Sequence, residues 1–138
     1  MIRNFMLLSL LFLAACTSVP NVQTDASGFQ DLTPAEAKEL LAQKEELGLF
    51  VLNTHTPYEG AIENTDAVIE DWENIANHLD QLPADKNTPI LAYCRSGRMS
   101  LAAIEQLKSL GYTNLYNLKG GMIAWDKAGY QVFNKTFE

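Results

Sequence analysis

Short apolar runs alternate along this chain with stretches whose apolar residues recur at helical spacing. The runs at 49–53, 89–93 and 115–118 are almost wholly apolar, which is typical of parallel strands buried on both faces. Shorter runs at 29–32 and 67–69 predict two further strands. Because strands alternate with helices, the pattern predicts an α/β domain in which helices cover both faces of a central, mostly parallel sheet.

Four segments have the apolar spacing of a helix. The first follows Thr33, which forms a capping box with Glu36, and we expect it to run to Leu47 and stop at Gly48. Its predicted buried residues are Leu40, Leu41 and Leu47. The second is predicted to begin after a capping Asp71 and to end at Pro83. Its predicted buried residues are Trp72, Ile75, Ala76, Leu79 and Leu82.

The third helix is predicted over 99–110, with Gly111 as its stop. The fourth is predicted over 122–128, after Gly120 and Gly121, which we interpret simply as a tight turn. We expect Trp125 to be a core residue of this last helix, and His78 to lie on the solvated side of the second helix. No internal repeats or low-complexity tracts interrupt the pattern.

Composition and charge narrow the class of protein. The chain has 138 residues, of which 47% are hydrophobic, enough for one domain with its own core. Its net charge is −7. A nucleic-acid-binding role is therefore disfavoured, because the chain lacks a basic footprint.

The N-terminus has the features of a targeting segment. Arg3 precedes an apolar stretch from Phe5 to Ala15, shorter than the roughly 20 residues that a membrane-spanning helix needs. This pattern fits the hydrophobic region of a secretory signal peptide. Residues 13–16, Leu-Ala-Ala-Cys, resemble the lipobox of bacterial lipoproteins, which implies cleavage before Cys16 and lipidation of its sulfur. An ordinary signal peptide with a chance cysteine is the alternative.

These features predict three parts: a lipoprotein signal peptide at 1–15, the lipidated cysteine and a flexible tether at 16–28, and a domain at 29–138. A lipid anchor implies attachment to a membrane of the bacterial cell envelope, with the domain facing the periplasm. Thr17 follows the cysteine in place of Asp, which favours the outer membrane by its resemblance to enterobacterial sorting signals. With Cys16 lipidated, Cys94 is the one remaining thiol, so no internal disulfide forms.

Cys94 stands where the strand at 89–93 gives way to a loop and then to a helix. Backbone N–H groups in such a loop point inward and form a nest for an anion. The helix dipole and the side chains of Arg95 and Arg98 add positive potential, which favours the nucleophilic thiolate. The sequence therefore predicts a reactive cysteine, with an inert buried thiol as the alternative. For the two arginines, exposure to solvent or pairing with surface acids is the alternative.

The segment 94–100, Cys-Arg-Ser-Gly-Arg-Met-Ser, resembles the active-site loop of rhodanese-like single-domain sulfurtransferases. Residues 111–125 are similar to that family's last core strand, Gly-Gly turn and Trp-bearing helix. The resemblance covers about residues 29–132 and implies a rhodanese-like three-layer domain.

The resemblance also implies a chemistry. Cys94 is implied to be the nucleophile that takes the outer sulfur from a small anionic donor such as thiosulfate. The resulting persulfide would then pass its sulfur to a thiol, cyanide or sulfite acceptor, without a metal or an organic cofactor. The implied substrate-binding residues of the loop are Arg95, Ser96, Gly97, Arg98, Met99 and Ser100.

One segment departs from the family pattern. The usual Asp-x-Arg after the second strand is replaced by Asn53, Thr54 and His55, and a later Gly-His-Ile segment is replaced by residues 59–66. His55 either lines the substrate pocket, where it helps to bind an anion when protonated, or it is a structural histidine. We expect the departure to affect the choice of substrate more than the fold.

Other chemistries of a lone cysteine are less compatible with the spacing. Cysteine phosphatases of this architecture carry an arginine six residues after the cysteine, and that position is Ser100. A Cys-x-x-Cys oxidoreductase is disfavoured because Gly97 occupies the second position. Two widely separated histidines and one cysteine do not form a zinc site. A membrane-tethered module that carries or binds sulfur and hands it to a partner protein remains the alternative to an enzyme.

Overall fold

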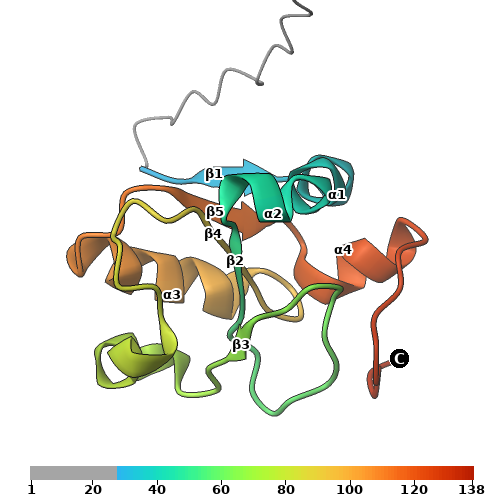
Figure 1. The fold of residues 1–138 in the computed structure, drawn as a ribbon. Helices are drawn as coiled ribbons and strands as arrows, with labels where there is room; N and C mark the ends of the chain where they lie inside the picture. Colours follow the sequence, from blue (N-terminus) through green and yellow to red (C-terminus); the bar gives the residue numbers. More distant parts are fainter. Residues whose placement is uncertain (1–27) are drawn as a thin grey trace, which may run out of the picture.

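A five-stranded parallel sheet forms the middle of the protein in the computed structural model, which describes residues 28–138 (Figure 1). Its strands lie in the order β1-β5-β4-β2-β3. Their bounds are Gln30–Leu32 for β1, Phe50–Asn53 for β2, Ala67–Val68 for β3, Ile90–Tyr93 for β4 and Leu115–Leu118 for β5. Every pairing within the sheet is parallel, so the predicted α/β class is confirmed.

Helices cover both faces of this sheet. Their bounds are Pro34–Ala42 for α1, Lys44–Leu47 for α2, Trp72–Gln81 for the 3₁₀ segment η1, Arg98–Ser109 for α3 and Gly121–Lys127 for α4. Figure 1 shows α3 and the yellow-green η1 on one side of the sheet, with α1 and α4 on the other. The sheet therefore forms the middle of three layers.

Each face has its own apolar core, because successive side chains of a strand point to opposite faces. In β2, Val51 packs into the core beneath α1 and α4, whereas Leu52 packs into the core beneath α3 and η1. In β4, Leu91 and Ala92 divide in the same way. The central strands are thus buried on both sides, which explains why they read as continuous apolar runs.

The register of β2 and β4 determines which residues meet at the edge of the sheet. Asn53 pairs with Tyr93, so the two strands end at the same edge of the sheet. The first residues beyond that edge are Thr54 and Cys94, and the N–H of Thr54 donates to the carbonyl of Tyr93 at 2.8 Å. Two segments far apart in the sequence therefore meet where the carboxyl ends of parallel strands usually carry a site.

The first helix differs from the prediction. The capping box of Thr33 and Glu36 is present, but α1 ends at Ala42 and a separate turn, α2, follows Gln43. Leu47 is 37% exposed, so the prediction that it is buried is wrong. The turn at Gln43 takes the last residues off the axis of α1, and Leu49 enters the core instead.

The prediction for the second helix is also wrong in detail. The segment η1 consists of 3₁₀ turns with non-helical backbone at Asn74 and His78, and Asp71 makes no side-chain cap. Ile75 and Leu82 are buried as predicted, whereas Ala76 and Leu79 are exposed. A side chain of α3 explains this difference. Gln106 accepts from the N–H of Ile75 at 3.0 Å and donates to the carbonyl of Trp72 at 2.7 Å, taking over backbone groups that a helix would pair internally.

The targeting segment, Cys16 and nearly all of the predicted tether lie outside the described residues. Within residues 28–138, we find no helix that combines the length and the apolar character needed to cross a membrane.

Candidate active site

Cys94 follows β4 directly and is 1% exposed. Its Sγ accepts a hydrogen bond from the backbone N–H of Gly97 at 3.0 Å, and Ser100 Oγ lies 3.6 Å from the same sulfur. Gly97 has a φ of +98° and stands immediately before α3, so the loop curls within three residues into the start of a helix. The sulfur therefore has a backbone donor and a hydroxyl donor beside it, close to the N-terminus of α3.

The start of α4 braces this loop. The N–H groups of Met122 and Ile123 donate to the carbonyls of Cys94 and Arg95 at 2.9 and 3.0 Å. Gly121 makes the approach possible, because a Cβ at this position would lie 2.4 Å from the carbonyl oxygen of Cys94. The interpretation of Gly120 and Gly121 as simply a turn is therefore incomplete, since Gly121 also lets α4 contact the cysteine loop.

A buried polar network lies behind the sulfur. Ser100 is fully buried, and its Oγ lies 2.6 Å from Oδ1 of Asn117 in β5. The amide nitrogen of Asn117 donates to Asp31 of β1 at 2.7 Å, which orients the amide so that its oxygen faces Ser100. The hydroxyl can donate to Asn117, to the carbonyl of Gly97 or to the sulfur, and so adapts to the charge that the sulfur carries.

An open pocket of about 270 Å³ lies in front of Cys94. Its lining brings together most of the residues predicted from sequence, namely His55, Cys94, Arg95, Ser96, Arg98 and Met99. Gly97 and Ser100 are buried behind the sulfur instead of lining the pocket. The predicted loop residues thus divide into a pocket wall and a support for the sulfur.

His55 lies at the pocket and is also held by hydrogen bonds, and its part in binding an anion stays a prediction. It lines the pocket, and it is only 6% exposed. Its backbone N–H donates to Oδ1 of Asn53 at 2.9 Å, and Asn53 donates in turn to the carbonyl of Gly60 at 3.0 Å. Its ring Nε2 is hydrogen-bonded to the carboxylate of Glu59. Asn53 and Glu59 therefore hold the imidazole in place at the pocket wall.

The two arginines of the loop have different surroundings. A terminal nitrogen of Arg95 lies 3.7 Å from Oε1 of Glu59, and its guanidinium carbon lies 5.3 Å from the ring centroid of Phe137. Arg98 is exposed, and no acidic group of residues 28–138 forms an ion pair with it. The cations of the pocket are thus one paired and one unpaired guanidinium.

Tyr93, the last residue of β4, supports the segment that leads to the pocket. Its hydroxyl accepts from the N–H of Ile62 at 3.2 Å and lies 2.8 Å from Oγ1 of Thr65. Burial raises the pKa of Tyr93 to about 12, because the phenolate would lose its hydration. The residue therefore stays neutral and hydrogen-bonded over the working pH range.

Sequence reasoning missed four residues of this arrangement: Glu59, Asn117, Gly121 and Phe137. Asn117 offered a signal, because it is a polar residue within an otherwise apolar strand. Glu59 offered a weaker one, because it stands four residues after His55. Phe137 offered none, since its contact with Arg95 joins residues more than forty positions apart.

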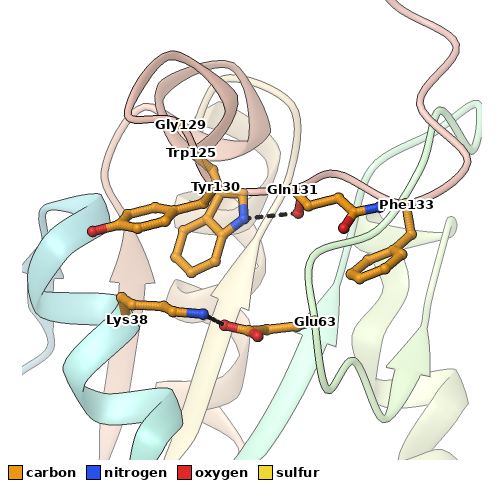
Figure 2. A pocket seen from close by; sticks show the side chains of 7 residues that line it. All are labelled: Lys38, Glu63, Trp125, Gly129, Tyr130, Gln131 and Phe133. Atoms are coloured by element: carbon orange, nitrogen blue, oxygen red, sulfur yellow. Dashed lines mark hydrogen bonds and ion pairs between the residues drawn. The ribbon is translucent and has the colours of Figure 1, made fainter.

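Trp125 belongs to a different part of the molecule. It is 1% exposed and donates from Nε1 to the carbonyl of Gln131 at 3.0 Å. Figure 2 shows it at the wall of a second pocket, where the paired side chains of Lys38 and Glu63 lie opposite. Its prediction as a core residue is confirmed. No group of three potential metal ligands is found in the part of the chain that the structure describes.

Comparisons with known proteins relate this chain to rhodanese-like domains and to sulfurtransferases. Residues 33–128 match the family model described as a rhodanese-like domain. A sulfurtransferase from Allochromatium vinosum is 32% identical over 89 residues, which cover 61% of this chain and 78% of that protein. An adenylyltransferase and sulfurtransferase, uba4, from Ogataea parapolymorpha is 39% identical over 54 residues. That match covers 39% of this chain but only 14% of the relative.

A solved structure shows the same fold. The rhodanese-like domain protein from Staphylococcus aureus superposes with a TM-score of 0.59 at 25% identity, covering 75% of this chain and 97% of that one. The residues that the family model matches include the cysteine loop, Gly120 and Gly121, and all strands of the sheet except β1, which lies just before them. This chain belongs to the rhodanese-like domain family.

Proposed function

We propose that this protein is a sulfurtransferase that carries sulfane sulfur as a persulfide on Cys94. The observation that carries the proposal is the position of Cys94 Sγ, which accepts the N–H of Gly97 and opens onto a pocket walled by Arg95 and Arg98. A negatively charged sulfur and an anionic donor are both favoured in such a site. The sulfurtransferase named among its relatives supports the same reaction class.

The reaction has two steps. The Cys94 thiolate attacks the outer sulfur of a donor such as thiosulfate, an S–S bond forms, and the donor's own S–S bond breaks so that sulfite leaves with the electron pair. A thiol, cyanide or sulfite, including a thiol of a partner protein, then attacks the outer sulfur of the persulfide. The acceptor–sulfur bond forms as the S–S bond of the persulfide breaks, and the electron pair of that bond returns to Cys94 as the thiolate, so ping-pong kinetics are expected.

The test is to incubate the purified full-length chain with thiosulfate and record its intact mass, and then to add cyanide and follow thiocyanate. We expect the mass to rise by one sulfur in the wild-type chain but not in Cys94→Ser, with repeated release of thiocyanate. A gain of sulfur without turnover would favour the alternative of a carrier or binding module. No gain from any sulfane donor would overturn the proposal.

We also propose that Cys16 is lipidated and anchors the domain to the cell envelope on the periplasmic side, with Thr17 favouring the outer membrane. Support comes from the lipobox-like residues 13–16. More than one acyl chain on one residue gives stable membrane binding, which a single chain does not. Fractionation of bacterial cells that express the wild-type chain or Cys16→Ser tests this. Equal membrane recovery of both proteins would contradict it.

A further inference from the structure

Glu59 joins two residues of the Cys94 pocket. One carboxylate oxygen is hydrogen-bonded to His55, and the other lies 3.7 Å from Arg95. The side chain of Glu59 is 20% exposed, so its interactions with both partners are only partly screened by water. A single acid therefore holds the imidazole and one of the two arginine side chains that line the pocket.

The C-terminal segment contacts both Glu59 and Arg95. The N–H of Thr136 donates to the carbonyl of Glu59 at 3.1 Å, and the buried ring of Phe137 lies under the guanidinium of Arg95. Gly60 allows this contact, because a Cβ there would lie 2.8 Å from the carbonyl oxygen of Phe133. These C-terminal residues lie beyond the family match at 33–128.

The consequence is a change in the charge that a donor meets. Arg95 is paired with Glu59, which partly offsets its charge, whereas Arg98 has no acidic partner among the described residues. A loop with two arginines is suited to a doubly charged donor, because a guanidinium matches oxyanion geometry. Of the two guanidinium groups, only that of Arg98 is left without an acidic partner, and it faces a donor together with the backbone N–H groups of the loop.

We propose that Glu59 sets the charge of the sulfur donor, so that the site prefers a singly charged thiosulfonate (R–SO₂–S⁻) to doubly charged thiosulfate. This inference rests on the proposed sulfur transfer. The Cys94 thiolate attacks the outer sulfur of the thiosulfonate and a new S–S bond forms. The bond to the sulfonyl sulfur breaks, and a sulfinate leaves with the electron pair, so charge and electrons balance.

The experiment compares thiosulfate with methanethiosulfonate, which replaces one charged oxygen by a methyl group and presents the same outer sulfur. Values of kcat/KM with cyanide as acceptor are measured for the full-length wild-type chain, Glu59→Gln and Glu63→Gln. Glu63 is the matched control, because it also pairs with a basic residue, Lys38, but in the second pocket (Figure 2).

We expect Glu59→Gln to shift the ratio of the two kcat/KM values toward thiosulfate by about tenfold, mainly through KM, as removal of one partly screened charge near an ionic ligand should. Glu63→Gln should leave the ratio unchanged. Comparing ratios removes the difference in intrinsic reactivity between the donors. A merely structural role of Glu59 would lower both values together and leave their ratio unchanged.

A second comparison keeps the proposal testable if Glu59→Gln folds poorly. Arg98→Gln should raise the KM for thiosulfate more than Arg95→Gln does, because Arg95 is already paired with Glu59. An unchanged donor ratio in folded Glu59→Gln, or a larger effect of Arg95→Gln, would overturn the inference while sulfur transfer itself stands. Failure of the wild-type chain to load sulfur from either donor would instead overturn the proposed function.

Discussion

Gly121 approaches Cys94 so closely that no side chain fits between them. A Cβ on Gly121 would lie 2.4 Å from the carbonyl oxygen of Cys94 and 2.6 Å from the carbonyl of Arg95. The adjacent N–H of Met122 donates to that same oxygen of Cys94 at 2.9 Å. The N-terminus of α4 and the cysteine loop therefore form one unit, and the position of the Cys94 sulfur depends on a residue well downstream.

Replacing Gly121 with alanine should damage both stability and sulfur loading. The added methyl group must displace backbone atoms, which cannot yield as a flexible side chain does. We expect a loss of about 1–3 kcal/mol in the free energy of unfolding and at least about a tenfold slower gain of sulfur by Cys94, because the loop moves with its brace. Urea denaturation and time-resolved intact mass measure the two effects.

Gly129→Ala is the matched control for this prediction. Gly129 also has a positive φ, +88°, but no atom lies within 4 Å of the point that an added methyl group would occupy. It shares the backbone strain of Gly121→Ala without the clash, so its sulfur loading should match the wild-type chain. Equal losses in the two variants would show that the strain of the left-handed backbone, and not the contact with Cys94, causes the effect.

Ser100→Ala should slow the formation of the persulfide. The hydroxyl of Ser100 lies 3.6 Å from Cys94 Sγ, and its removal takes away a donor that can turn toward a charged sulfur. A loss of about 1.4 kcal/mol corresponds to an approximately tenfold lower rate. Ser109→Ala, at an exposed hydroxyl of the same helix, is the control. An unchanged loading rate in Ser100→Ala would show that the hydroxyl serves only the link to Asn117.

Gln106→Leu should loosen η1 without changing the chemistry of Cys94. The substitution leaves the N–H of Ile75 and the carbonyl of Trp72 without their side-chain partner. We expect a loss of about 1–3 kcal/mol in the free energy of unfolding, and faster hydrogen exchange confined to η1. Glu105→Gln, whose pair with Lys108 is on the surface, provides the comparison. Slower sulfur loading in Gln106→Leu would contradict the expectation that η1 can loosen without affecting Cys94.

Tyr93 should make the fold sensitive to alkaline pH. Burial raises the pKa of Tyr93 from its ordinary 10.0 to about 12. Between these values the folded state holds a proton that the unfolded state has lost, so stability falls as pH rises from 10.0 to about 12. Urea titrations across this range should show a shallower decline for Tyr93→Phe than for the wild-type chain. If stability fell equally steeply with pH in both proteins, Tyr93 would not be the cause of the decline.

Tyr116 contributes to the same decline, because burial also raises its pKa. Tyr116→Phe is therefore the companion variant, and ultraviolet absorbance of the phenolates separates the two residues. At neutral pH, Tyr93→Phe should be somewhat less stable, since the N–H of Ile62 loses its acceptor.

Local sequence signals were sufficient for the elements that end at a clear boundary. The bounds of β5 agree with the prediction, and α3 begins one residue earlier than expected, directly after Gly97. These elements combine an apolar pattern with a glycine at the point where the chain must turn. The predictions were wrong at α1 and η1, where periodicity continues but another part of the molecule satisfies the backbone or the core.

The sequence by itself determined the α/β class, the position of Cys94 at the end of a strand, and the loop that leads into α3. It could do so because each depends on neighbouring residues: apolar runs, a glycine, and the start of a helix. Only the tertiary structure decided that Glu59 pairs with Arg95, that Asn117 faces Ser100, and that the C-terminal segment contacts Arg95. Those contacts join residues that are far apart in the chain, and the packing of strands and helices brings them within reach.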